Sequence, residues 1–487
     1  MSNEGINHIV VLMLENRSFD HMLGYLEQGC LPALSTSDGV PADPSDEHSP
    51  QVPVRWLDSP TYMDVRVDPG HGFCDVMRQL TGEDRCETDE NRQTGWSRPY
   101  KPTNKGFVWN YAQRKGLNNK HPEDPTEIMA CYPANRLPVL STLARSFAAC
   151  SRWHCSVPSE TWPNRLFAHA GTSFGTLGFD TPIRQEQTIY DLLDRPDLGA
   201  RVYAGDIAQV LTFGRDVIPR IRHMDDFASD VQEGDLPAYT FIEPRHFDSR
   251  RFGKSNSQHP IGRMFGLTSS GYVPLGEALI ARVYTILRSN PQIWDSTLLI
   301  VTYDEHGGFY DRLPPPEVDP TGDVARNGFK FDLLGPRVPA IVISRYVGQG
   351  VVEHEKQFDH TSITRTVRDL FAITTHLSTR ERAAETLTGL LDFDNPRSSS
   401  EMPSLEDYAR DDWNPSFDEA IDEEKDDRPL DDFQTQLLEL ARAIDPEMAA
   451  ELEVAENTTS LSVDSQVARF VEKHYPPSRS SRGREQR

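Results

Sequence analysis

The chain opens with a stretch that predicts the centre of its fold, His8-Ile9-Val10-Val11-Leu12-Met13-Leu14-Glu15-Asn16. Its short continuous apolar run, Ile9–Leu14, is typical of a strand buried on both faces of a helix-covered parallel sheet. Ligands of open α/β sheets bind beyond the carboxyl ends of the strands. Glu15 and Asn16 follow the run directly, and their side-chain oxygens suit a divalent cation. From these two residues alone, capping of the next helix explains the pattern equally well.

A second stretch repeats this pattern near residue 300. An apolar, β-branched run that begins at Thr297 is followed by Asp304 and Glu305, and then by Gly307 and Gly308. The glycines allow the backbone to turn sharply after the strand. If the two strands converge, three carboxylates meet in one crevice and repel one another unless a cation lies between them. The sequence therefore predicts a bound metal or raised pKa values.

A third segment, Pro158–Gly171, supplies a candidate nucleophile. It is typical of a loop that enters a helix, because Pro163 fits the first turn and Gly171 fits a C-terminal stop. Thr161 would then lie beside free backbone N–H groups, which bind phosphate well. A coordinated divalent metal lowers the pKa of a hydroxyl enough to make it a nucleophile. Taken alone, the segment is better explained as a helix cap.

The three segments together resemble the bacterial phosphoesterase family of phospholipases C and related acid phosphatases, within the alkaline phosphatase-like superfamily. The matching motifs occur in family order from residue 8 to about residue 367. They are Glu15-Asn16 with Arg17–Asp20, Asp68–His71, Thr161-x-Pro163-Asn164-Arg165, Ser257–Pro260, Tyr303–Gly308 and Phe358–Ser362. The chain departs from the family at Ser159-Glu160, where relatives commonly have a small Gly-Pro pair, and in having no export signal ahead of the first strand.

The resemblance implies both a fold and a site. The fold would be a three-layer α/β sandwich with a mostly parallel central sheet, alkaline phosphatase-like, over residues 1–395. The implied metal ligands are Glu15, Asn16, Asp304 and Glu305, with Thr161 as both ligand and nucleophile. The implied phosphate pocket is lined by His71, His259 and His360. Threonine at the nucleophile position resembles the phospholipase C branch of the family.

The implied function is metal-dependent phospholipase C activity on phosphatidylcholine-type lipids. Thr161 would attack phosphorus, His360 or His259 would protonate the leaving diacylglycerol, and water would hydrolyse a phosphothreonine intermediate. A choline head group would need an aromatic cage, for which Trp109, Tyr111 and Trp162 are candidates. The alternatives are an acid phosphatase acting on phosphomonoesters and an inactive phosphoesterase-like binding protein. Oxygen ligands favour calcium or magnesium, whereas the superfamily precedent favours zinc, which we expect.

The composition restricts the partners of the chain. It has 487 residues, of which 37% are hydrophobic, and a formal net charge of −25. This length is enough to bury a large core. The acidic balance excludes nucleic acid as an expected partner and gives no general attraction to anionic lipids. The negative charge of the chain does not disfavour binding to zwitterionic phospholipids at a membrane surface in this way.

The chain shows no sequence signal for a membrane anchor or a secretory leader. No apolar stretch approaches the roughly 20 residues that span a bilayer, and the N-terminus lacks a charged-then-apolar leader. We therefore expect a protein that is cytoplasmic, or an effector exported folded by a dedicated leaderless secretion system, whose machinery would be a partner. For such a protein we expect its cysteines to be free thiols, although Cys150 and Cys155 could bridge a short loop.

Strands alternating with helices support the α/β assignment. Further strands are expected at Ala200–Ala204, Ala238–Glu243 and Val338–Ser344. Helices are expected at Asn135–Cys150 and Gly276–Arg288, where apolar residues recur at helical spacing.

The composition changes near residue 395, where Asp394–Ser400 is typical of a linker. Residues 396–487 form an acidic and helical extension, with an acidic stretch at Asp418–Asp427 and expected helices at Leu430–Ala441 and Ser462–His474. Two interpretations stay open. We favour helices that pack on the catalytic core; the other is a regulatory tail that covers the site or docks on a partner.

Overall fold

The structure is a computed structural model. It describes residues 5–478, with gaps at 30, 58–64, 66, 85–97, 117–118, 181–182, 185, 250, 261–272, 411–431 and 448–462.

The core is one eight-stranded sheet with the strand order β12-β6-β11-β10-β1-β9-β7-β8. Strand β11 is antiparallel to both of its neighbours, and the other neighbouring pairs are parallel. The strands are β1 (His8–Leu14), β6 (Ala148–Cys150), β7 (Ala200–Ala204), β8 (Ile221–His223), β9 (Tyr239–Glu243), β10 (Thr297–Tyr303), β11 (Ala340–Ile343) and β12 (Val351–Glu353). The predicted mostly parallel α/β sheet is therefore confirmed.

The two strands that end in acidic residues are neighbours at the centre of this sheet. Strand β1 pairs in parallel with β10, and Leu14 is opposite Tyr303. The other neighbour of β1 is β9. Both central strands are buried along nearly their whole length, as expected for a sheet covered on both faces. The register places Glu15 beside Asp304 at the carboxyl edge.

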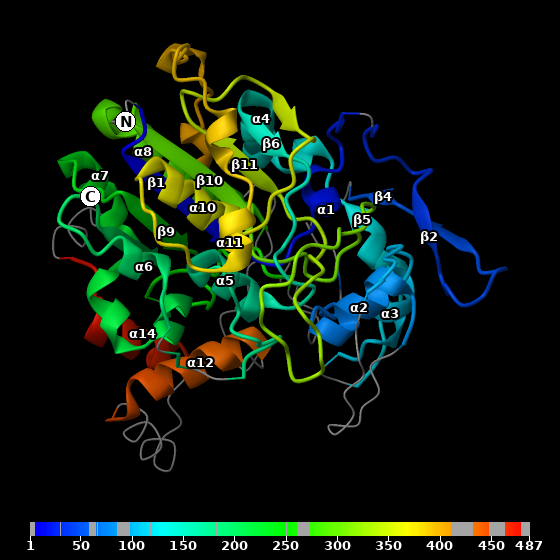
Figure 1. Ribbon diagram of the computed structural model, residues 1–487. Helices are drawn as coiled ribbons and strands as arrows, with labels where there is room; N and C mark the ends of the chain where they lie inside the picture. Colours follow the sequence, from blue (N-terminus) through cyan, green and yellow to red (C-terminus); the bar gives the residue numbers. More distant parts are fainter. Residues whose placement is uncertain are drawn as a thin grey trace.

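Helices cover the sheet in two groups, and the sheet lies between them (Figure 1). One group consists of α4 (Pro138–Ser146), α7 (Phe227–Glu233), α8 (Val273–Ser289) and α9 (Pro291–Trp294). The other consists of α5 (Thr161–Ala170), α6 (Ile189–Leu192), α10 (Thr361–Leu370) and α11 (Thr379–Ala383). A short helix, α1 (Phe19–Leu23), follows the loop after β1. This arrangement gives the predicted three layers.

Residues 31–134 form an insert beside the sheet, seen on the right of Figure 1. It contains α2 (Phe73–Thr81), α3 (Phe107–Gln113) and the small strand pairs β2–β3 (Gly39–Pro41, Gln51–Pro53) and β4–β5 (Arg55–Trp56, Ala130–Cys131). The insert has its own apolar cluster, which includes Leu34, Val54, Phe107, Tyr111 and Met129. Phe309, shortly after β10, packs into this cluster and so attaches the insert to the carboxyl edge of the sheet.

The predicted helix at Asn135–Cys150 is only partly correct. A 3₁₀ turn at Ala134–Arg136 and helix α4 occupy its first part, with Pro138 in the first turn as expected. Its last residues instead form β6, which pairs with β11 and β12. Pairing within the sheet outweighs the helical spacing of the apolar residues here. The predictions for β7, β9, β11 and α8 are confirmed to within a few residues at each end.

The C-terminal extension packs on the core, as we favoured from the sequence. Its helices are α12 (Asp432–Ile444) and α14 (Val463–His474), at the bottom of Figure 1. Fully buried residues of both helices, including Leu437, Leu440 and Phe470, belong to the main apolar core. The acidic stretch lies outside the described residues, and the domain boundary at residue 395 stays a prediction.

The expectation of free thiols throughout the chain is wrong. Cys74 is disulfide-bonded. Cys131, Cys150 and Cys155 are free and buried, so the bridge between Cys150 and Cys155 is not formed. The expectation rested on the expected location of the protein, and the spacing of these cysteines does not by itself predict which of them are bonded. None of the helices that the structure describes is both long and apolar enough to cross a bilayer.

A buried carboxyl on α8 should make stability depend on pH. Glu277 is fully buried and accepts hydrogen bonds from the backbone N–H groups of Val139 and Leu140 at the start of α4. Burial raises its pKa to about 8, although these hydrogen bonds oppose the rise. The unfolded chain loses this proton at lower pH than the folded chain, so the free energy of unfolding falls as pH rises from about 4.5 to about 8.

We therefore expect Glu277→Gln to remove part of the pH dependence, by up to about 1.4 kcal/mol for each pH unit. Denaturant titrations at pH 5.5, 7 and 8 measure it, with the wild type as reference because other groups titrate in both proteins. Parallel pH profiles for the two proteins would contradict the assignment.

Candidate active site

The ends of β1 and β10 are joined by hydrogen bonds at the carboxyl edge of the sheet. The backbone N–H of Asn16 donates to Asp304 Oδ1 at 3.0 Å. Asn16 has a left-handed backbone (φ 57°), which asparagine tolerates better than most residues. Gly307, also left-handed (φ 65°), lies so close that a Cβ there would clash with the backbone of Asn16. The turns after the two strands therefore depend on Asn16 and Gly307, which tolerate a left-handed backbone. Glu15 and Glu305, beside these turns, are completely buried.

Thr161 begins α5 and contacts this edge directly. Its hydroxyl donates to Asn16 Oδ1 at 3.2 Å, and its side chain is almost completely buried. The loop before the helix is held by Asn164, whose amide donates to the carbonyls of Ser159 and Glu160. The helix ends at Gly171 with a left-handed C-cap. The predicted loop, helix start and helix stop are thus confirmed, and Thr161 lies at a helix N-terminus, where phosphate binds well.

Arg165, one turn further along α5, supplies positive charge to the buried carboxylates. Its Nε donates to Asp304 Oδ2 at 3.0 Å, and Nη2 lies 3.4 Å from Glu15 Oε1. Burial raises the pKa of Asp304 to about 6; Arg165 opposes the rise, while Glu15 and Glu305 reinforce it. Burial also acts to raise the pKa of Glu15, but His246 and Arg165 outweigh it and hold that pKa at about 2.

Two further residues orient Glu15 and were not predicted from the sequence. His246 Nδ1 lies 3.2 Å from Glu15 Oε1, and the Gln209 side-chain amide donates to the same oxygen at 3.2 Å. Asp206 holds the loop of His246 by accepting from the backbone N–H groups of His246 and Phe247. The only sequence signal was the position of His246 after strand β9.

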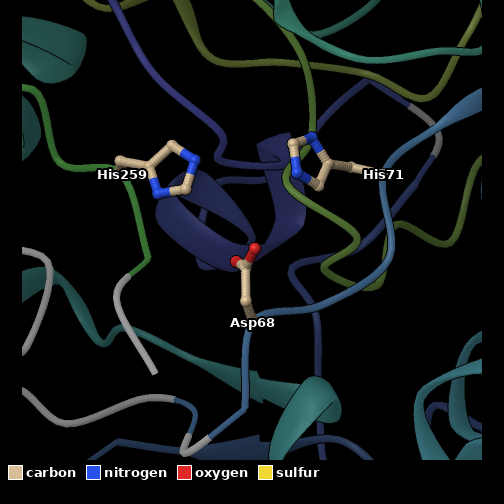
Figure 2. Close-up of side chains that lie close together, drawn as sticks. All are labelled: Asp68, His71 and His259. Carbon is tan, nitrogen blue, oxygen red and sulfur yellow. The ribbon is translucent and has the colours of Figure 1, made fainter. Parts of the chain in front are cut away.

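His71 and His259 lie together at the same edge, and Asp68 joins them (Figure 2). In Figure 2 the carboxylate of Asp68 points between the two imidazole rings. One donor atom from each residue lies within 4.8 Å of the others, and His71 Nδ1 lies 2.9 Å from Glu305 Oε1. Burial alone would lower the pKa of His71, but the negative charges of Glu305 and Asp68 raise it to about 10.

His360 is differently placed. Its Nε2 contacts the backbone carbonyl of Asp304 at 2.5 Å, and its Nδ1 accepts from the Trp153 indole at 3.3 Å. The carboxylate of the preceding residue, Asp359, accepts instead from the backbone N–H of Thr361. Burial lowers the pKa of His360 to about 4. With both ring nitrogens occupied by protein groups, His360 supports the end of β10.

The C-terminal helix α12 contacts the histidines of this edge through Phe433. The Phe433 ring is stacked with His259, with centroids 6.4 Å apart, and meets His246 edge-on at 5.1 Å. It also packs on Trp162, the residue after Thr161, at 5.7 Å. Of the proposed choline-cage residues, Trp162 therefore lies near the nucleophile. Tyr111 lies in the apolar cluster of the insert instead.

The donors at this edge fit a divalent cation. Glu15, Asp304 and Glu305 are three fully buried carboxylates, of which the first two pair with Arg165 and the third lies beside His71 and His306. Glu15 Oε2 is buried and has no hydrogen-bond partner among the described residues. A buried carboxylate oxygen without a partner is costly, and a metal ion would satisfy it. The oxygens come from carboxylate, amide and hydroxyl groups, which suit hard cations, while the adjacent imidazoles also admit zinc.

Comparison with known proteins identifies the family of the chain. The model of the Phosphoesterase family matches residues 6–374. Non-specific phospholipase C3 of Arabidopsis thaliana is 33% identical over 90% of this chain and 82% of its own length. Phospholipase C A of Mycobacterium tuberculosis is 29% identical over 82% of this chain and 79% of its own length. A solved protein of the alkaline phosphatase superfamily from Vibrio parahaemolyticus is similar with a TM-score of 0.31 at 12% identity, over 54% of this chain and 65% of that one. The chain thus belongs to the Phosphoesterase family and is a hydrolase of phosphoester bonds.

Proposed function

We propose that this protein is a divalent-cation-dependent phospholipase C that hydrolyses phosphatidylcholine-type lipids at a membrane surface. The observation that carries the proposal is the hydroxyl of Thr161, which is buried at the start of α5 and bonded to Asn16 within a group of carboxylates. Relatives that match most of the chain are named phospholipases C, which favours a lipid phosphodiester as the substrate.

The candidate ligands are Glu15, Asn16, Thr161, Asp304 and Glu305. A bound cation would lower the pKa of the threonine hydroxyl and offset the charge of the phosphate. Arg165 keeps Asp304 and Glu15 oriented toward this position. We expect zinc, with calcium and magnesium as the alternatives to be tested.

In the proposed first step, the Thr161 oxygen bonds to phosphorus and the bond from phosphorus to the diacylglycerol oxygen breaks. Backbone N–H groups at the start of α5, together with His71 and His259, would hold the phosphoryl oxygens, on which charge accumulates. We assign protonation of the leaving oxygen to His259, because both ring nitrogens of His360 bind protein groups. Water then breaks the phosphothreonine ester and restores Thr161.

A substrate panel tests this function. The metal-replete protein is expected to hydrolyse dispersed phosphatidylcholine to diacylglycerol and phosphocholine, with a higher kcat/KM than for p-nitrophenyl phosphate. Sphingomyelin is included to test whether the protein accepts a lipid with a different backbone. Faster hydrolysis of the monoester would favour the acid phosphatase alternative, and no turnover of either ester by metal-replete protein would favour the inactive binding protein.

Metal removal is a separate test. Chelation is expected to abolish hydrolysis, and addition of Zn²⁺, Ca²⁺ or Mg²⁺ one at a time identifies the ion that restores it. Metal analysis of the purified protein gives an independent assignment. Full activity of protein shown to be metal-free would contradict the proposed site. Export by a dedicated secretion system stays a prediction, which fractionation of producing cells would check.

A further inference from the structure

The two sides of the candidate site belong to different parts of the fold. Asp68 and His71 lie in the insert, just before α2, whereas Glu305 follows the central strand β10. Nevertheless His71 Nδ1 and Glu305 Oε1 are 2.9 Å apart. No strand of the central sheet carries the loop with Asp68 and His71. Packing of α2 on an apolar cluster that includes Phe167 and Phe329 holds the insert as a whole, and side-chain contacts with the residues after β10 set the finer position of this loop relative to Glu305.

The side chain of Gln79 in α2 joins these two parts. Its amide nitrogen donates to the carbonyl of Gly70 at 2.6 Å and to Asn110 Oδ1 at 2.9 Å. Its carbonyl oxygen accepts from His306 Nε2 at 2.8 Å. Asn110 is itself oriented, because its amide donates to Asp75. The amide nitrogen of Gln79 thus faces two oxygens, which determines the orientation of the amide chemically.

His306 extends this connection to Glu305. Its Nδ1 lies 3.2 Å from Glu305 Oε2, so the fully buried ring lies between the Gln79 amide and the Glu305 carboxylate. Gly308 (φ 74°) packs against the loop that carries Asp68 and His71. A Cβ on Gly308 would lie 2.8 Å from the carbonyl oxygen of Gly70 and 3.4 Å from Gln79 Nε2. The two parts are therefore in close contact on both sides of the Gln79 amide, which is 1% exposed.

We propose that Gln79 is a positioning residue that sets the distance between the loop of Asp68 and His71 and the strand end of Glu305. An uncharged amide suits this place, because it provides donors and an acceptor without adding charge beside the buried carboxylates. The proposal rests on the proposed function in one respect, namely that His71 binds phosphoryl oxygens and Glu305 binds the cation.

Gln79→Glu tests the proposal, because it keeps the size of the side chain and an acceptor for His306 while losing both donations. In the zinc-saturated full-length protein, calorimetry is expected to show inorganic phosphate binding about 10- to 100-fold more weakly. The kcat for phosphatidylcholine is expected to fall more than KM changes. Inorganic phosphate reports on the pocket whichever ester is the substrate, so failure of this proposal is distinguishable from failure of the proposed function.

Gln28 provides a matched control. It is 2% exposed and accepts from Arg337 in a separate ionic cluster. Gln28→Met and Gln79→Met are expected to lower the unfolding temperature to a similar extent, but only Gln79→Met should weaken phosphate binding.

A double-mutant cycle separates positioning from a merely structural role. If Gln79 acts through the loop, Gln79→Glu should weaken phosphate binding much less when His71 is already alanine. Phosphate binding by Gln79→Glu within twofold of wild type would overturn the proposal. Equal weakening by Gln28→Met, or additive effects of the His71 and Gln79 substitutions, would do the same.

Discussion

Replacing Thr161 with alanine is expected to lower kcat by at least about 10⁴-fold, as loss of a nucleophile does in other hydrolases. The hydroxyl is held by Asn16 at the start of α5, and alanine has no oxygen to replace it. Steady-state rates of diacylglycerol release from phosphatidylcholine measure the effect.

Thr161→Ser is the control for this prediction. Serine keeps the oxygen but loses the methyl group, so it should retain far more activity than alanine. Both variants should unfold within a few degrees of the wild type, because each substitution removes only one or two atoms and at most one side-chain hydrogen bond, the one to Asn16. Activity of the alanine variant within tenfold of wild type would show that Thr161 is not the nucleophile.

The second large effect is expected at Arg165. In metal-free protein, Arg165→Met should lower the free energy of unfolding by about 3–5 kcal/mol, because it leaves Asp304 and Glu15 buried without their arginine. Activity should also fall, since both carboxylates lose their orientation. Denaturant titration and steady-state kinetics measure the two effects.

Arg337→Met is the matched control for Arg165. Arg337 is fully buried and pairs with Asp20 and Asp311 in a separate cluster, so its loss should destabilise the fold comparably. Divalent cation should raise the unfolding temperature of Arg165→Met more than that of Arg337→Met, because loss of the Arg165 guanidinium leaves Glu15 and Asp304 in need of another positive partner, whereas Arg337 pairs with other carboxylates. An equal response of the two variants would contradict a cation site beside Arg165.

The sequence was sufficient to predict the parts of the site that follow regular elements. The strand ends at Glu15 and Asp304 could be recognised because each follows a short continuous apolar run, which is typical of a buried strand in a parallel sheet. The start of α5 was predictable from Pro163, and its end from Gly171. These local signals, in the right order, also carried the resemblance to the family.

Long-range contacts could not be predicted in this way. His246 and Gln209 reach Glu15 from separate loops, and no spacing rule connects them. Phe433 contacts His259 from a helix that the sequence showed only as amphipathic. The orientation of His360 depends on a backbone carbonyl and on Trp153, which lie far from it in the sequence. In each case the contact is decided by tertiary packing.

The stereochemical course at phosphorus tests the central claim, a covalent phosphothreonine intermediate, most directly. Each in-line displacement inverts phosphorus. Hydrolysis of a lipid chiral at phosphorus in isotopically labelled water should therefore give phosphocholine with net retention of configuration, because attack by Thr161 and then by water makes two displacements. Net inversion would show that water attacks the lipid directly, and would contradict the role assigned to Thr161.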